Sequence, residues 1–231
     1  SSNQGGGVSI GMGDGILSNV EIINNYSNGV VAGLQITGGG NQTLSNVIVS
    51  GNHGEQNAVG GVYIHTSSLT SGENGGHIYL NNLIISENTN TNAANATALK
   101  VSGGAGIVPI TILNSIIANH EGATIIDLNT SHVDIINTDI VNNNCGGDVI
   151  DGFDYRKLLL VRYTSTINII NSIIWGNLDE TQEDDCDITL RQSSSLNSTY
   201  SNIENGEESI TIDDAWGEPV GINWLEGNID E

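Results

Sequence analysis

The stretch NSIIWGN, residues 171–177, is a short apolar run with an asparagine at each end. Close relatives of it recur along the chain and fit one template: an apolar residue, any residue, Asn, a small or apolar residue, any residue, then Ile or Val. The copies occupy residues 17–22, 44–49, 80–85, 112–117, 135–140 and 169–174, with a degenerate copy at 198–206. Successive template asparagines are 23 to 36 residues apart, a spacing typical of a solenoid.

The template alternates with period two, which predicts β-strands and not helices. A second apolar strand precedes each copy by about ten residues, at 7–10, 33–36, 61–64, 98–101, 125–128, 159–163 and 188–191. We expect a third strand in the remainder of each repeat. The pattern predicts an all-β chain, a right-handed parallel β-helix of about seven coils that forms a single domain over residues 1–231.

The template asparagines have a structural interpretation. Asn tolerates the left-handed backbone of a sharp bend, and its amide can hydrogen-bond to the next coil, which builds a ladder of stacked amides. The composition agrees, because 30 Gly and only 2 Pro suit many tight turns, and an aromatic content of 4% requires an aliphatic core.

The charge is strongly acidic. Five Lys and Arg against 27 Asp and Glu give a net charge of −22, which disfavours nucleic acid and anionic membranes as partners and favours cations such as Ca²⁺. A solvated acidic surface that keeps an extended protein soluble is the alternative. No apolar run approaches the roughly 20 residues of a membrane span, so we expect no membrane insertion.

The phrases GGVYI (60–64), NSIIWGN and INWLEGNIDE (222–231) resemble the right-handed parallel β-helix repeat proteins of bacterial surfaces and secretomes, many of them exported by type IX secretion. The resemblance covers nearly the whole chain. It implies a secreted bacterial protein with an extracellular or cell-surface location. In that family the final phrase continues into Asp-Pro and an aromatic residue, whereas this chain stops at Glu231, so we expect a fragment of a longer chain.

A resemblance to the pectate-lyase-like fold also suggests where a catalytic site would lie. In β-helix polysaccharide lyases a sheet face carries calcium-binding carboxylates and an Arg or Lys base, which removes a proton next to a uronate carboxylate. The outward positions of the upstream strands supply Lys100, Asp127, Arg162 and Arg191. Only Asp127 is a carboxylate, so this set is incomplete for a lyase. On the same face, Tyr63 and His65 are candidates for stacking against a glycan.

Acidic segments in the last third of the chain are candidate calcium sites. They match neither an EF-hand loop nor a calcium-binding nonapeptide, so calcium would occupy an irregular loop site, and solvated loops are the alternative. The candidate ligands are Asp184, Asp185, Asp187, Asp213 and Asp214.

The two cysteines, Cys145 and Cys186, follow the same strand on adjacent coils. Their Cα atoms could approach to the roughly 5.5 Å that a disulfide requires. We favour a disulfide, which suits an oxidising compartment, over two independent thiols.

One outward position of the template is apolar in three consecutive coils, where it is Ile48, Ile84 and Ile116. An isolated rod gains nothing from such a stripe. Either loops of this chain cover it, or another chain does, through self-assembly or contact with other surface proteins.

Two classes of function follow. We favour an extracellular structural or adhesive module of a cell-surface or filament-forming protein, without catalysis. The alternative is a calcium-dependent polysaccharide lyase, or a glycan-binding module, that acts on acidic polysaccharide.

Overall fold

The computed structural model describes residues 6–56, 58–66, 76–91, 95–104, 108–146, 155–179, 186–213 and 217–229. Within these ranges the chain is all-β, with three sheets of 8, 12 and 6 strands and one short 3₁₀ helix, η1 (Gly206–Ser209). Every pairing between strands is parallel. In the described part of the chain, no helix is long and apolar enough to cross a membrane.

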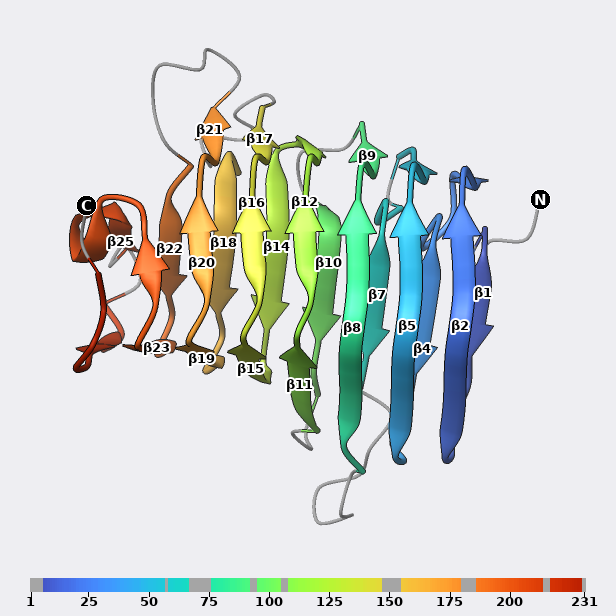
Figure 1. The fold of residues 1–231 in the computed structure, drawn as a ribbon, viewed down its shortest axis with the longest axis horizontal. Helices are drawn as coiled ribbons and strands as arrows, with labels where there is room; N and C mark the ends of the chain where they lie inside the picture. The colour runs from blue at the N-terminus through green and yellow to red at the C-terminus, as the bar shows by residue number, and fades with distance from the viewer. Residues whose placement is uncertain are drawn as a thin grey trace.

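The chain visits the three sheets in a repeating order, and we call one passage through all three a round. The first sheet contains β1 (Val8–Ile10), β4 (Leu34–Thr37), β7 (Val62–His65), β10 (Ala96–Ser102), β14 (Thr124–Asn129), β18 (Lys157–Arg162), β22 (Ile188–Arg191) and β25 (Ile210–Asp213). The first seven are the predicted upstream strands, to within about two residues at each end, and β25 is an eighth strand that the sequence analysis did not predict. Figure 1 shows successive rounds side by side along the long axis of the molecule.

The second sheet carries the template, and the third consists of two-residue strands. The second contains β2 (Gly15–Ile23), β5 (Gln42–Ser50), β8 (Ile78–Ser86), β11 (Pro109–Leu113), β12 (Ile116–Ala118), β15 (His132–Ile136), β16 (Asp139–Val141), β19 (Thr166–Ile170), β20 (Ile173–Trp175), β23 (Ser195–Thr199), β24 (Asn202–Ile203) and β26 (Gly221–Trp224). The third contains β3 (Tyr26–Ser27), β6 (His53–Gly54), β9 (Thr89–Asn90), β13 (Glu121–Gly122), β17 (Asn144–Cys145) and β21 (Leu178–Asp179).

The template asparagines form the expected ladder at a bend of the second sheet. All six adopt left-handed backbone, with φ between 48° and 56°. The Asn82 amide donates to Asn46 Oδ1 (2.7 Å), and Asn171 donates to Asn137 Oδ1 (2.6 Å). The ladder changes partner once, where Asn114 donates to Asn81 and not to the template residue Asn82.

The residue after each template Asn determines whether the strand continues through the bend. In the first three rounds it is Val or Leu, and β2, β5 and β8 run unbroken for nine residues each. In later rounds it is a buried Ser or Thr, and the strand divides in two. Ser172 Oγ accepts a hydrogen bond from the Thr138 amide (3.1 Å) and donates to the Ile170 carbonyl (2.9 Å). Its hydroxyl thus pairs two backbone groups at the bend, as buried polar groups require.

The core lies between the sheets and is aliphatic. It is built from inward-facing residues of successive strands, such as Leu34 and Ile36 of β4 and Leu44 and Val49 of β5, all fully buried. Because each side chain packs against its equivalents in the neighbouring rounds, the core is a continuous column of Ile, Leu and Val.

Candidate functional site

The outward face of the first sheet carries the nominated residues, which are those predicted from the sequence as candidates for catalysis. Tyr63, Lys100 and Asp127 occupy one column, since Tyr63 pairs with Lys100 and Lys100 with Asp127. Arg162 lies one outward position further along its strand, opposite Asn129, because Leu160 takes the place beside Asp127. All four nominated residues therefore come from consecutive strands of one sheet, β10, β14, β18 and β22, and three of them, Lys100, Asp127 and Arg162, contact one another.

These three residues form a compact ion cluster. Arg162 binds Asp127 through two parallel contacts, Nε to Oδ1 at 3.0 Å and Nη2 to Oδ2 at 2.8 Å. Lys100 Nζ lies 3.9 Å from Asp127 Oδ2 and donates to Asn95 Oδ1 at 2.7 Å. Asp127 is only 2% exposed, so its carboxylate balances two cations inside the structure.

Burial acts on both cations of the cluster. Desolvation lowers the pKa of Lys100, with the Arg162 charge acting in the same direction and Asp127 opposing it. Desolvation also acts to lower the pKa of Arg162, but the charge and hydrogen bonds of Asp127 outweigh it and the pKa is raised. Arg162 is therefore a fixed cation, and Lys100 is the group of the pair whose proton is easier to remove.

Tyr63 and His65, nominated for glycan stacking, contact each other on this face. Tyr63 Oη lies 3.1 Å from His65 Nδ1, and their rings are tilted by 39° with centroids 5.7 Å apart. Burial lowers the pKa of His65, so the imidazole is neutral at pH 7.

The nominated calcium ligands that the structure describes bind basic side chains. Asp187 Oδ2 lies 3.2 Å from Lys157 Nζ, and Asp213 Oδ2 lies 2.8 Å from Arg191 Nε, as an ion pair without a well-aligned hydrogen bond. Asp184, Asp185 and Asp214 lie outside the described residues. Within the described ranges no three His, Cys, Asp or Glu side chains gather in a way that could hold a metal ion.

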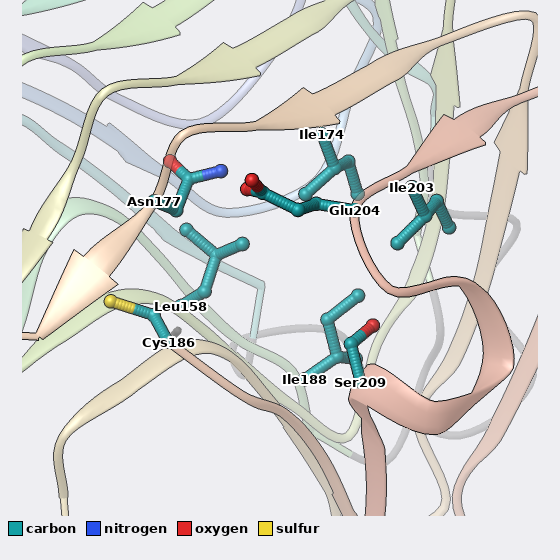
Figure 2. A pocket seen from close by; sticks show the side chains of 8 residues that line it. All are labelled: Leu158, Ile174, Asn177, Cys186, Ile188, Ile203, Glu204 and Ser209. Carbon is teal, nitrogen blue, oxygen red and sulfur yellow. The ribbon is translucent and has the colours of Figure 1, made fainter. Parts of the chain in front are cut away.

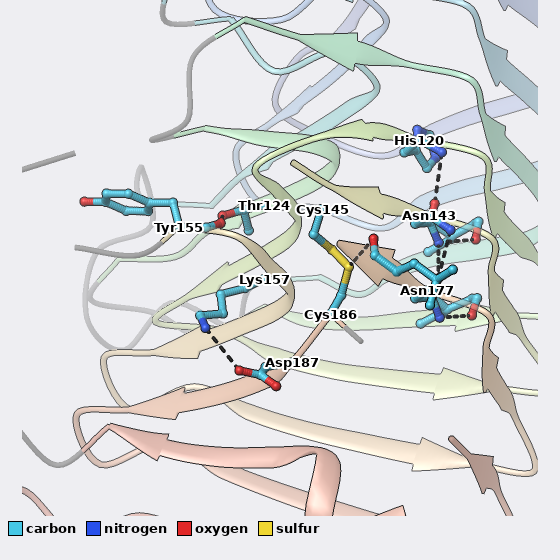
Figure 3. The surroundings of a disulfide bond; sticks show 12 residues. His120, Thr124, Asn143, Cys145, Tyr155, Lys157, Asn177, Cys186 and Asp187 are labelled. Atoms are coloured by element: carbon cyan, nitrogen blue, oxygen red, sulfur yellow. Dashed lines mark hydrogen bonds and ion pairs between the residues drawn. A yellow bond between two sulfur atoms is a disulfide. The ribbon is translucent and has the colours of Figure 1, made fainter. Parts of the chain in front are cut away.

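The predicted disulfide is confirmed. Cys145 and Cys186 are bonded, with their Cα atoms 5.9 Å apart. Cys145 ends β17 of the third sheet, and Cys186 lies two residues before β22 of the first sheet (Figure 3). The bond therefore joins two sheets as well as two successive rounds. Both residues are buried in the core.

A small cavity lies beside this disulfide (Figure 2). Its volume is about 10 Å³, and it is lined mostly by apolar side chains, among them Leu158 and Ile188, together with Asn177, Glu204 and Ser209. A space of this size holds one water molecule at most. It is therefore a packing defect next to the Cys145–Cys186 bond and too small for a ligand.

The apolar column on the second sheet lies as the template predicts. Ile48 pairs with Ile84, and Ile84 with Ile116, on consecutive strands. Ile84 is 37% exposed and Ile116 40%, while Ile48 is half-buried. Asp139 follows Ile116 in the column, and Ile173, 43% exposed, follows Asp139.

A second ladder, which the sequence reasoning missed, runs inside the molecule where the second sheet turns into the third (Figure 3). Its members are buried and stack round upon round: Asn52, Asn88, His120, Asn143 and Asn177. The signal was present, since Asn177 is the closing asparagine of NSIIWGN and each member follows a residue with positive φ. His120 is the one substitution in an otherwise uniform series.

Both ring nitrogens of His120 contact backbone groups. Nδ1 lies 3.1 Å from the Asn88 amide nitrogen and 3.2 Å from the Asn88 carbonyl oxygen, and Nε2 lies 3.0 Å from the Ile85 carbonyl oxygen. Desolvation lowers the pKa of His120 to about 4, although backbone hydrogen bonds to Asn88 and Ile85 oppose the shift.

None of the family models, curated proteins or solved structures compared with this chain matches it.

Proposed function

We propose that this chain is an extracellular structural module that assembles through its second sheet and performs no catalysis. Its three parallel sheets would be the walls of a right-handed parallel β-helix of about seven coils in a secreted bacterial surface protein. The Cys145–Cys186 disulfide supports an oxidising, extracellular location.

The exposed column Ile48, Ile84 and Ile116 carries this proposal. A contiguous apolar strip on the outward face of a sheet favours burial against another surface. The proposed partner is a second copy of this chain, because a two-fold axis can place the same column of two copies face to face. The acidic surface opposes close approach of two copies, so assembly should strengthen as salt screens the charge.

The ion pairs support a structural role for the nominated catalytic residues. Arg162 is held by Asp127, and Arg191 by Asp213. A guanidinium that is already bound to a carboxylate is a poor partner for a substrate carboxylate. Calcium binding by the acidic loops stays a separate prediction.

Sedimentation velocity over a range of concentrations tests the assembly. The wild-type chain should self-associate, more strongly at 0.5 M than at 0.1 M salt, because the Debye length falls about twofold over this range. Ile84→Asp should weaken association at least tenfold. This residue faces outward in a column that already contains Asp139, so the variant should fold.

Thr43→Asp is the matched control. Thr43 is exposed on β5 of the same sheet, away from the apolar column, and the substitution adds the same charge. A wild-type chain that stays monomeric at high concentration and high salt would overturn the assembly proposal, as would equal effects of the two variants.

A lyase acting on acidic polysaccharide is the second candidate, and the lowered pKa of Lys100 favours it, because a lysine base needs a depressed pKa. The test is formation of unsaturated uronate products from polygalacturonate or alginate with calcium present. Lys100→Ala should abolish the activity, and Lys157→Ala, at a different ion pair on the same sheet, should not. Absence of products in the wild type would remove this candidate.

A further inference from the structure

The third sheet carries an open groove on its outward face that is distinct from the nominated sites. The groove runs across the strands, and each of four successive rounds contributes one residue to it. These residues pair in register on consecutive strands and are His53, Thr89, Glu121 and Asn144. The groove has a volume of about 430 Å³, within the range of about 300–1,000 Å³ that is usual for small-ligand sites. Figure 1 shows β9, β17 and β21 of this sheet along one edge of the molecule.

An aromatic pair stands at one end of the groove. Tyr26 precedes His53 in the same row and stacks on it, with ring centroids 5.7 Å apart and planes 18° apart. Tyr26 is 58% exposed, and hydrogen bonding from the neighbouring Glu55 raises the pKa of its hydroxyl. A large flat side chain that stacks on a neighbouring ring yet stays exposed is suited to stacking against a ligand ring.

The rest of the row offers hydrogen-bonding groups of both kinds. Thr89 Oγ1 lies 2.7 Å from His53 Nδ1, which orients the threonine hydroxyl. Glu121 is exposed and accepts hydrogen bonds, and the Asn144 side-chain NH2 group is a donor. Asn144 Oδ1 is buried and has no hydrogen-bond partner among the described residues, so a ligand in the groove would be met by the donor end of this amide.

The charge of the groove disfavours anionic ligands. It is lined by Glu121 and by no lysine or arginine of the described chain, and the whole protein carries −22. Uronates, phosphates and sulfates would meet like charge here. An aromatic platform followed by paired donors and acceptors suits instead an uncharged molecule rich in hydroxyl groups.

We propose that this groove binds a linear, neutral oligosaccharide that runs across the strands, with the Tyr26–His53 pair as its stacking platform and Thr89, Glu121 and Asn144 as its hydrogen-bonding partners. Parallel strands stand about 4.8 Å apart, close to the length of one sugar unit, so each round offers one contact per sugar. The row from His53 to Asn144 spans about 14 Å. The site is independent of the proposed assembly, which uses the second sheet.

Isothermal titration calorimetry with four neutral hexasaccharides, of β-1,4-glucose, β-1,3-glucose, β-1,4-mannose and β-1,4-xylose, tests the proposal. Oligogalacturonate serves as the anionic comparison and a chitosan oligomer as the cationic one. We expect at least one neutral hexasaccharide to bind, and Tyr26→Ala and Glu121→Ala each to weaken its binding at least tenfold. Both side chains are exposed, so circular dichroism should show an unchanged fold.

Tyr79→Ala is the matched control, because Tyr79 is an exposed tyrosine stacked on His77, at 4.4 Å and 27°, on the second sheet. It should leave binding unchanged, as should Ile84→Asp, so failure of the glycan site and failure of the assembly are separable. Binding of none of the neutral probes would overturn the proposal. So would preference for either charged oligomer, or equal loss in the Tyr79 variant.

Discussion

At the scale of the residue, most positions of NSIIWGN have an identifiable structural role. Asn171 and Gly176 adopt positive φ, 48° and 66°, in the region where L-residues other than Asn and Asp are costly. Ser172 turns inward to pair backbone groups at the bend, and Ile174 packs in the core. Each of these positions has a structural role, and other rounds fill two of them differently, with Val, Leu or Thr at the position of Ser172 and Glu or Asn at that of Gly176.

His120 supports a prediction about acid stability. Its pKa is about 4 in the folded chain and about 6.5 when unfolded, so between these values the unfolded chain binds more protons. The free energy of unfolding should therefore fall as the pH drops through this window. The contribution of His120 is about 3 kcal/mol, fully present above pH 6.5 and lost near pH 4.

Many carboxylates titrate near the lower end of the same range, so the measurement is a comparison with His120→Asn, which restores the residue type of the ladder. Urea denaturation of both proteins at pH 7 and at pH 4 should show the wild type losing about 3 kcal/mol more than the variant. Parallel losses in the two proteins would contradict the prediction.

At the scale of the element, one position divides the second-sheet strands into two kinds. Where Val or Leu follows the template Asn, the strand continues through the bend, and where Ser or Thr follows, it splits in two. The cause is local, because a buried hydroxyl can replace the strand partner of a backbone amide. The positions with Ser or Thr thus bend the second sheet without leaving backbone groups unpaired.

Replacing Ser172 tests this account. Ser172→Ala should leave the Thr138 amide without its partner and reduce the free energy of unfolding by about 1–3 kcal/mol. Ser172→Thr is the control, since Thr138 fills the same position one round earlier. Urea denaturation gives the stabilities, and hydrogen exchange at the Thr138 amide should be faster in the alanine variant alone. Equal stability of the two variants would argue against a role for the hydroxyl.

At the scale of the whole molecule, each round contacts mainly its two neighbours, so stability is close to a sum of local terms. The Cys145–Cys186 disulfide is the covalent exception, and it closes a sequence separation of 41 residues. In the chain-entropy view, a loop of this length stabilises the folded state by about 4 kcal/mol.

Removing this bond should therefore act locally. The double variant Cys145→Ala with Cys186→Ala should lose about 4 kcal/mol of stability in the rounds around β17 and β22. Hydrogen exchange should show lost protection there and little change in β4 and β5. A reductant should destabilise the wild type and leave the double variant unaffected. Uniform loss of protection along the chain would contradict the nearest-neighbour description.

The amino-acid sequence by itself determined the strands, the parallel stacking of equivalent strands, the left-handed asparagines and the disulfide. These depend on alternation within a strand and on backbone preferences at single residues, which act over a few positions. The step from repeated strands to stacked rounds followed because each strand carries the same apolar face, which must be buried against its copies.

Only the tertiary structure decided which side chains meet between rounds. The rounds differ in length, and the outward register of β18 places Leu160, not Arg162, beside Asp127. The Asp127–Arg162 pair, the entry of His120 into the inner ladder and the row of groups in the third-sheet groove all depend on this register. Contacts between residues about 30 positions apart depend on how rounds of unequal length align. The residue pattern within one round does not specify that alignment.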